Sequence, residues 1–207
     1  MKSKKGILIV VSGFSGAGKG TLMKRLVEEY DDYALSVSAT TRNPREGEQD
    51  GREYFFKSTE EFEKMIADDQ LIEYARYVNH YYGTPKEYVE HQLEAGKDVI
   101  LEIEIQGALL VKEKFPETLL MFVAPPSADE LKRRLINRGT ETMDVINSRL
   151  ARAKEESQGM ENYDYLVVND DLEACVRKMH DIIRAEHNKM SRNQKFVDQI
   201  RNELTEL

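Results

Sequence analysis

The stretch from Gly13 to Thr21, Gly-Phe-Ser-Gly-Ala-Gly-Lys-Gly-Thr, constrains the fold of this chain more than any other. It follows an apolar run at residues 7–11 and precedes a helical pattern that begins at Leu22. A strand, a glycine-rich loop and a helix N-terminus in this order form a phosphate-binding loop, because the backbone N–H groups and the positive end of the helix dipole face one anion. The alternative, a glycine-rich turn with a solvated lysine, leaves both flanks unexplained. The stretch therefore predicts a nucleoside triphosphate site in which Lys19 reaches the terminal phosphates.

One position departs from the usual form of this loop. Most such loops place a Ser or Thr hydroxyl on Mg²⁺ directly after the lysine, where this chain has Gly20. We therefore expect Mg²⁺, the cofactor that accompanies a nucleoside triphosphate, to be held mainly by phosphates and water, with Thr21 and Glu102 as the candidate protein ligands. The predicted ATP-binding residues of the loop are Gly13, Phe14, Ser15, Gly16, Ala17, Gly18, Lys19, Gly20 and Thr21.

Composition and charge limit the classes of function. A net charge of −8 argues against DNA or RNA as the main partner, because phosphate backbones favour strongly basic surfaces. No apolar run approaches the roughly 18 residues of a membrane span, and the run after the basic N-terminus is too short for a signal peptide. The single Cys175 excludes an internal disulfide, and the four histidines lack metal-ligand spacing. We expect a cytoplasmic protein without a membrane partner, in which Cys175 is a small core residue of a helix.

Strand and helix patterns alternate along the chain, which predicts an α/β fold with a parallel core sheet of the P-loop NTPase type and helices on both faces. The expected strands cover residues 7–11, 98–103, 118–123 and 165–168, with a short one at 36–38. The expected helices cover residues 18–29, 106–114, 128–137, 144–156 and 172–189. Two inserts interrupt the alternation. We divide the single domain into a core of residues 1–37, 97–125 and 159–190, a first insert of residues 38–96, a second insert of residues 126–158 and a C-terminal helix of residues 191–207.

The first insert is a small mixed α/β lobe with a polar, doubly basic loop. We expect short strands around residues 54–56 and 81–82 and a helix at residues 60–67. Arg42 and Arg45 in the loop can present forked donors to one phosphate, and the Tyr54 and Tyr82 hydroxyls can add to them. Alone, two arginines near a proline more often form a solvated loop.

At this point the sequence closely resembles the guanylate kinases, nucleoside monophosphate kinases of the P-loop class, and specifically the bacterial type. The Gly-Lys-Gly-Thr ending of the phosphate loop already resembles nucleoside monophosphate kinases. The resemblance runs from about Gly6 to about Glu186. It rests on the ordered motifs Ser36–Glu48, Gly51–Phe56, Leu71–Ala75, Tyr81–Thr84, Asp98–Gly107, Ala124–Ser127, Arg138–Thr142 and Val168–Asp171.

The resemblance implies a GMP site in the first insert, which becomes a GMP-binding lobe. In guanylate kinases the residues that match Arg42, Arg45, Tyr54 and Tyr82 hold the GMP phosphate, and those that match Ser38, Glu73 and Thr84 bind the guanine base. This assignment agrees with the chemistry of guanine, which offers an O6 acceptor beside N–H donors and so pairs with a hydroxyl donor and a carboxylate acceptor. Adenine would leave the carboxylate unpaired, at a cost of about 1–3 kcal/mol.

Two acidic residues, Glu102 and Glu104, close an apolar strand and project from the same face of it. Acids at the carboxyl end of such a strand can hold Mg²⁺ through water or orient the acceptor nucleotide, so we include both among the GMP-binding residues. Many guanylate kinases have aspartates at these positions, from which this chain departs by one methylene each. The alternative is a pair of solvated acids at a strand end.

The second insert supplies positive charge and, by the resemblance, forms a helical lid over the triphosphate. Arg134 and Arg138 share one helix face, and Arg149 follows after the next turn. The residue that matches Asn169 lies near the adenine of ATP. The predicted catalytic residues are Lys19, Arg42, Arg134, Arg138 and Arg149, of which Arg134 and Arg138, with Asn169, also bind ATP.

The resemblance implies ATP-dependent phosphorylation of GMP, and of dGMP, in purine nucleotide metabolism and GMP recycling. ATP and GMP are the expected partners, and the chain acts as a monomer or a homodimer. Phe196, Ile200 and Leu204 recur every four residues, which predicts an amphipathic C-terminal helix that docks on its own core.

Three alternatives stay open from the residues. A kinase of the same fold for another phosphorylated acceptor, such as a ribose bisphosphate, would lack the guanine-binding set around Glu73. A non-catalytic guanylate-kinase-like module that binds peptides typically degrades the phosphate loop, whereas this chain retains Lys19. A P-loop switch protein would need a base-recognition motif for GTP that we do not find.

Overall fold

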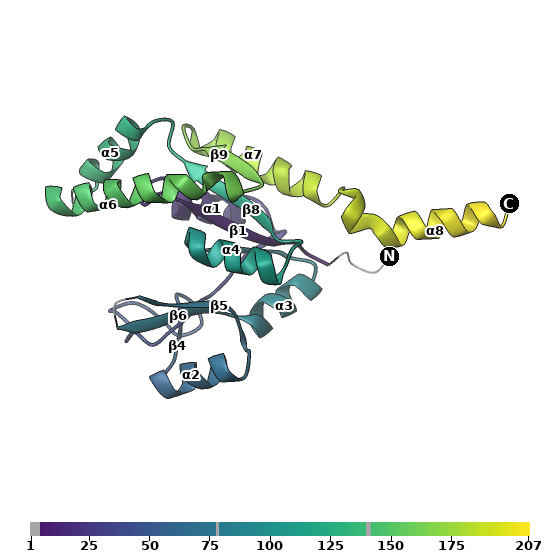
Figure 1. The fold of residues 1–207 in the computed structure, drawn as a ribbon, viewed down its shortest axis with the longest axis horizontal. Helices are drawn as coiled ribbons and strands as arrows, with labels where there is room; N and C mark the ends of the chain where they lie inside the picture. The colour runs from purple at the N-terminus through teal and green to yellow at the C-terminus, as the bar shows by residue number, and fades with distance from the viewer. Residues whose placement is uncertain (1–4, 78, 140–141) are drawn as a thin grey trace.

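The computed structural model describes residues 5–77, 79–139 and 142–207, so residues 1–4, Val78, and Thr140 and Glu141 of the Arg138–Thr142 motif lie outside it. The core is a parallel sheet in the order β2-β7-β1-β8-β9. Its strands are β1 (Leu8–Gly13), β2 (Tyr33–Leu35), β7 (Asp98–Glu102), β8 (Leu119–Ala124) and β9 (Tyr165–Val168). The structure therefore confirms the predicted α/β fold, whose layers are visible in Figure 1.

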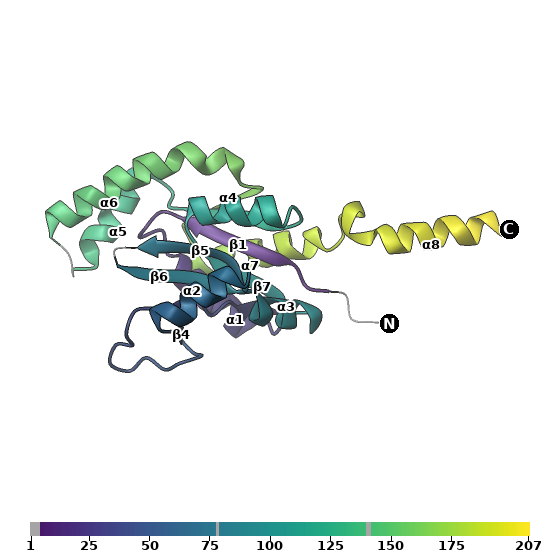
Figure 2. The same ribbon diagram turned by 60° about the horizontal axis from the view of Figure 1, so that its bottom comes forward.

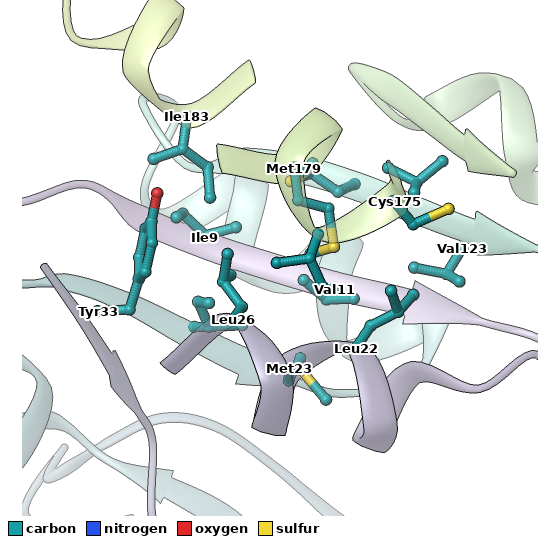
Figure 3. Packing of buried hydrophobic residues seen from close by; sticks show 14 of the residues in the cluster. Ile9, Val11, Leu22, Met23, Leu26, Tyr33, Val123, Cys175, Met179 and Ile183 are labelled. Carbon is teal, nitrogen blue, oxygen red and sulfur yellow. The ribbon is translucent and has the colours of Figure 1, made fainter. Parts of the chain in front are cut away.

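Helices cover both faces of the core sheet because consecutive residues of its strands are apolar, and successive side chains point to opposite faces. Ile9 and Val11 of β1 pack with α1 (Lys19–Glu29) and α7 (Leu172–Glu186), as Figure 3 shows. Leu8 and Val10 face the other way, against α3 (Lys86–Glu94) and α4 (Ile105–Lys114). Cys175 lies in the first of these clusters with 2 % of its surface exposed, as predicted. The two apolar layers fix the carboxyl end of β1, where the phosphate loop begins.

The first insert folds around a second, mixed sheet in the order β4-β3-β6-β5. Its elements are β3 (Ala39–Thr40), β4 (Phe55–Phe56), α2 (Thr59–Ala67), β5 (Leu71–Tyr77) and β6 (His80–Pro85). A capping box begins α2, in which Ser58 and Glu61 satisfy each other's backbone N–H groups. Phe62 of α2 is fully buried against this sheet. The insert thus has a small apolar core of its own.

The second insert contributes α5 (Ala128–Asn137), α6 (Met143–Glu156) and the 3₁₀ segment η1 (Ser157–Asn162). Leu131 and Leu135 of α5 are buried with Ile146 of α6, and Phe14 of the phosphate loop packs on this cluster. In Figure 1 this helical pair lies above the core sheet and the second sheet lies below it, toward the same end of the molecule.

The C-terminal helix departs from expectation. A short 3₁₀ segment η2 (Met190–Asn193) leads into α8 (Gln194–Thr205), which projects away from the core in Figures 1 and 2. Phe196 and Leu204 are 62 % and 64 % exposed, so the prediction that this helix docks on its own core is wrong. The helix is amphipathic as predicted, but none of its residues is buried.

Other differences concern single elements. The short strand expected at residues 36–38 is β2, three residues earlier, because Tyr33 is the residue that enters the apolar cluster. The sequence analysis named neither β5 nor α3, and α7 ends at Glu186 rather than residue 189. Among the described residues, none of the helices combines the length and the apolar character needed to cross a membrane.

Candidate active site

The phosphate loop connects β1 to α1 in the geometry that its glycines permit. Gly16 and Gly18 adopt φ values of 93° and 92°, which side chains other than glycine rarely tolerate. A Cβ at Gly18 would also lie 2.5 Å from Nδ2 of Asn169. No side chain caps the N-terminus of α1, so the N–H groups of its first turn stay open toward an anion. The loop is therefore shaped for phosphate before any ligand arrives.

Lys19 lies at the start of α1, with its ammonium group folded back onto the loop. Its Nζ donates to the carbonyl oxygens of Gly13 at 2.7 Å and Phe14 at 3.3 Å. Burial lowers the pKa of Lys19, and the nearby Glu102 carboxylate partly opposes this effect. The charge is thus partly desolvated, which strengthens its interaction with a phosphate.

Two neighbouring cavities open beside the loop. The phosphate cavity, of about 690 Å³, is lined by Gly13, Ser15, Lys19, Tyr54, Glu102, Ile103, Glu104, Ile105, Val145, Ser148, Arg149, Arg152 and Glu156. The base cavity, of about 480 Å³, is lined by Ser38, Tyr54, Glu73, Ala75, Arg76, Tyr82, Gly83, Glu102, Ile103, Glu104, Gln106 and Gly107. Both share a wall made of Tyr54 and the segment from Glu102 to Glu104. A ligand in one cavity therefore lies directly beside a ligand in the other.

The base cavity contains a buried carboxylate that a neighbouring hydroxyl group orients. Glu73 of β5 is only 9 % exposed, and its Oε1 accepts a hydrogen bond of 2.7 Å from the hydroxyl of Thr84 on β6. Burial raises the pKa of Glu73. Its other oxygen lies 3.5 Å from where a Cβ of Gly107 would be, so the glycine keeps the first turns of α4 clear beside it. Ser38 lines the same cavity, whereas Thr84 is fully buried behind Glu73.

Glu102 and Glu104 both line the two cavities, but they have different partners. Glu102 ends β7 opposite Lys19, and the cleft raises its pKa by desolvation, an effect that Lys19 reduces. Glu104 is the N-cap residue of α4 and accepts a hydrogen bond of 2.6 Å from Arg152 on α6. Of the two, Glu102 therefore has the stronger effect on Lys19, and Glu104 is also paired with Arg152.

The predicted arginine loop lies at the edge of the shared wall. Arg42 forms a bidentate ion pair with Glu48, with both distances 2.9 Å, and its guanidinium carbon lies 5.3 Å from the centre of the Tyr54 ring. The Tyr54 and Tyr82 rings meet edge to face at 6.1 Å. Arg45 is exposed in the same loop. The structure thus brings Arg42, Tyr54 and Tyr82 together, with Arg45 in the adjoining turn.

The three predicted arginines of the second insert have different environments. Arg134 donates to the carbonyl oxygens of Ala17 and Asn169, at 3.3 and 2.8 Å. Arg149 donates to the Ser15 hydroxyl in the phosphate cavity. Arg138 ends α5 in an exposed position and lines neither cavity. In this conformation Arg134 and Arg149 reach the phosphate loop directly.

The remaining predicted residues lie around the loop. Asn169 is buried, and its side chain donates to the Ala17 carbonyl at 2.8 Å, so here it contacts the loop backbone. Thr21 is exposed on α1 and is not among the residues that line the phosphate cavity. Nothing lies within 4 Å of a Cβ built at Gly20, so packing does not explain the missing hydroxyl there.

The sequence analysis missed several charged residues of the site. Arg152 and Glu156 line the phosphate cavity, and Glu48 holds Arg42. The spacing of Arg149 and Arg152, three residues apart on one helix face, was a signal for Arg152. Nothing in the local sequence around Glu48 distinguishes it from the neighbouring acid Glu46, because its contact depends on how the loop folds back.

The chain is similar to known proteins over most of its length. Residues 5–186 match the family model described as guanylate kinase. A guanylate kinase of Oceanobacillus iheyensis is 55 % identical over 93 % of this chain and 93 % of its own, and one of Caldanaerobacter subterraneus is 53 % identical over 97 % of each. The crystal structure of guanylate kinase from Anaplasma phagocytophilum is similar with a TM-score of 0.72, at 33 % identity over 93 % of this chain and 92 % of that one. This chain therefore belongs to the guanylate kinase family.

Proposed function

We propose that the two cavities hold GMP and the triphosphate of ATP end to end, so that the γ-phosphoryl group passes from ATP to GMP, or to dGMP, across their shared wall. The chain is an enzyme of the guanylate kinase family, whose reaction yields ADP and GDP. The shared wall is the observation that supports this assignment of each substrate to a cavity. It joins a cavity built on a phosphate loop to one that contains a buried carboxylate.

Glu73 and Ser38 account for the choice of guanine. The Glu73 carboxylate is an acceptor for the N–H groups of guanine, and Thr84 orients it through their 2.7 Å hydrogen bond. A hydroxyl has one proton to donate, and that of Thr84 is committed to Glu73. Ser38 is then the hydroxyl of this set that can donate to guanine O6. Adenine would leave Glu73 without a donor at its acceptor edge, which costs about 1–3 kcal/mol.

The GMP phosphate needs no general base. Its second pKa lies near 6, like that of a phosphoserine, so its oxygen is already anionic at neutral pH. Arg42, Arg45, Tyr54 and Tyr82 hold this phosphate in our proposal, and catalysis consists of alignment and charge neutralisation. Lys19 and the arginines of the second insert, Arg134, Arg138 and Arg149, neutralise charge on the group that moves.

Mg²⁺ fits the residues of the phosphate cavity. Glu102 lines this cavity beside Lys19, so its carboxylate can meet an ion that is bound chiefly by phosphates and water. Glu102 would hold it through water, whereas Thr21, the other predicted ligand, is exposed and does not line this cavity, so we do not assign it to Mg²⁺. When bound, Mg²⁺ supplies further positive charge to the β- and γ-phosphates.

We also propose that different parts of the chain have different functions. The core is residues 1–37, 97–125 and 159–190, the GMP-binding lobe is residues 38–96, and the lid is residues 126–158. Closure of the lobe and the lid would exclude water and so suppress ATP hydrolysis. We place the protein in the cytoplasm as a monomer or a homodimer, without membrane or nucleic-acid partners.

A coupled assay of nucleoside diphosphate production tests the substrate assignment. Purified protein with MgATP is offered GMP, dGMP, AMP, UMP and CMP in turn. We expect turnover of GMP and dGMP and at least about tenfold lower kcat/KM for the other three, in line with the unpaired-carboxylate cost. Turnover of AMP or UMP at the rate of GMP would overturn the assignment of guanine to the base cavity.

A further inference from the structure

The loop that we assign to the GMP phosphate contains Glu48, whose carboxylate contacts a second residue of the loop in addition to its ion-pair partner. Glu48 Oε1 accepts from Arg42 Nη2 and its Oε2 accepts from Arg42 Nη1, both at 2.9 Å. The same Oε2 also accepts the backbone N–H of Arg45 at 2.7 Å. One carboxylate therefore binds both arginine positions of the loop, one through its side chain and the other through its backbone.

The pair is internal to the loop and well enclosed. Only 14 % of the Arg42 side chain and 17 % of the Glu48 side chain are exposed. Residues 43–47 between them are exposed, so the apolar core does not fix their conformation. The hydrogen bond with Arg42 lowers the pKa of Glu48, which keeps the carboxylate ionised through the neutral range. Because the partners are six residues apart, their contact sets the shape of this loop rather than of the fold.

The ion pair with Glu48 leaves some N–H groups of Arg42 available to a ligand. A guanidinium has five N–H groups. Glu48 uses two of those of Arg42, and the Asn43 carbonyl takes the second N–H of Nη1 at 2.7 Å. The two that remain are Nε–H and one N–H of Nη2, which lie on one edge of the planar group. Neither Glu48 nor the Asn43 carbonyl uses that edge.

Aromatic rings complete the arrangement. The Arg42 guanidinium lies 5.3 Å from the Tyr54 ring centre and 5.8 Å from that of Phe56. The Tyr82 hydroxyl also forms a hydrogen bond with Arg42, which raises the pKa of Arg42 after the larger effect of Glu48. Because Glu48 and Asn43 use the other donors, this hydroxyl lies at the remaining edge, where Tyr82 and Arg42 can hold one phosphate together. The Arg42 guanidinium is therefore held by a carboxylate along one edge and lies beside aromatic rings. A phosphate can bind its remaining edge through two parallel hydrogen bonds.

We propose that Glu48 is a positioning residue for the acceptor nucleotide: it locks the Arg42 fork and the Arg45 backbone so that one edge of the guanidinium is presented to the GMP phosphate. The inference rests on the proposed function, because it requires that Arg42 binds this phosphate. Glu48 itself does not touch GMP. A lysine could not replace Arg42 here, since an ammonium cannot serve a carboxylate and a phosphate along two separate edges.

Calorimetric binding of GMP and of guanosine to the Glu48→Gln variant tests the proposal. This substitution keeps the size of the side chain but removes its charge. We expect GMP to bind about tenfold more weakly than to the unmodified protein, and guanosine, which has no phosphate, to bind equally well. The matched control is Glu46→Gln, an exposed acid of the same loop, which should change neither affinity.

A double-mutant cycle separates positioning from a general loss of structure. If Glu48 acts mainly through Arg42, then Glu48→Gln causes a much smaller further loss of GMP affinity in an Arg42→Ala background, where only its hydrogen bond with the Arg45 backbone can still be lost. Equal losses for GMP and guanosine, unchanged GMP affinity, or a full additional loss in the Arg42→Ala background would each overturn the proposal. Failure of the proposed function looks different, because the unmodified protein would then not bind GMP at all.

Discussion

At the scale of single residues, the site is distinguished by what burial does to its charges. Glu73 and Glu102 have raised pKa values and Lys19 a lowered one, and in each case desolvation is the main cause. The cavities therefore hold groups whose charged forms are less well solvated than in water. Such groups gain more from a charged or polar ligand than fully solvated groups do.

The raised pKa of Glu73 predicts a pH dependence of GMP binding. Guanine N–H groups need the ionised carboxylate, and burial moves its protonation to a higher pH than that of an ordinary glutamate. GMP affinity should therefore fall as the pH decreases through this raised pKa. Calorimetry of the unmodified protein and of Glu73→Gln measures it. The phosphate of GMP titrates in both proteins, so the difference between their pH profiles isolates Glu73. Parallel profiles would contradict the assignment.

Lys19→Ala should lower kcat by about a hundredfold or more, because it removes a cation from the transferring phosphoryl group. The melting temperature should change little, since the Lys19 side chain donates only two hydrogen bonds, both within the loop. Steady-state kinetics and calorimetry measure both effects. Lys24→Ala on the same helix is the matched control, because that side chain is 77 % exposed. A variant with near-normal turnover would show that Lys19 is not catalytic.

At the scale of elements, α6 shows why part of the site was predictable and part was not. Its helical pattern and Arg149 could be recognised in the sequence, because helix periodicity is local. Its contact with the core could not: Arg152 reaches Glu104, 48 residues earlier in the chain, and only the folded arrangement joins them. The same holds for Arg134, whose hydrogen bonds to Ala17 and Asn169 span three separate segments.

Arg152→Gln should reduce kcat about fivefold or more, because it removes a cation from the phosphate cavity. Stability should change by less than about 1 kcal/mol, since the Arg152–Glu104 pair is largely exposed. Turnover and thermal unfolding measure the two effects. Arg133→Gln, which removes an exposed arginine of α5 paired with Glu130, is the control. Equal kcat values for the two variants would show that Arg152 has no part in the reaction.

At the scale of the whole molecule, the predictions that succeeded were those with a strong local or ordered signal. The phosphate loop and the core strands β1, β7, β8 and β9 follow from contiguous residues. The misplaced β2 is three residues long, and whether such a strand forms depends on its neighbour β7. The position of α8 failed for a related reason: amphipathic spacing predicts a helix but does not say which surface covers its apolar face.

Deleting residues 194–207 should therefore shift the melting temperature by less than about 3 °C, because no residue of α8 is buried and about 1 kcal/mol corresponds to such a shift in a chain of this size. Calorimetry of the full and the shortened chain measures it. A larger loss would mean that α8 is covered in solution, and light scattering would then distinguish a homodimer from a monomer.

The central claim is that two nucleotides meet at the wall formed by Tyr54 and the Glu102–Glu104 segment. The most direct measurement is a crystal structure with GMP and a non-hydrolysable ATP analogue bound together. We expect guanine beside Glu73 and Ser38, the GMP phosphate on Arg42, and the γ-phosphate on Lys19, with the two phosphates facing each other. GMP bound outside the base cavity, or with its phosphate directed away from Lys19, would contradict the account.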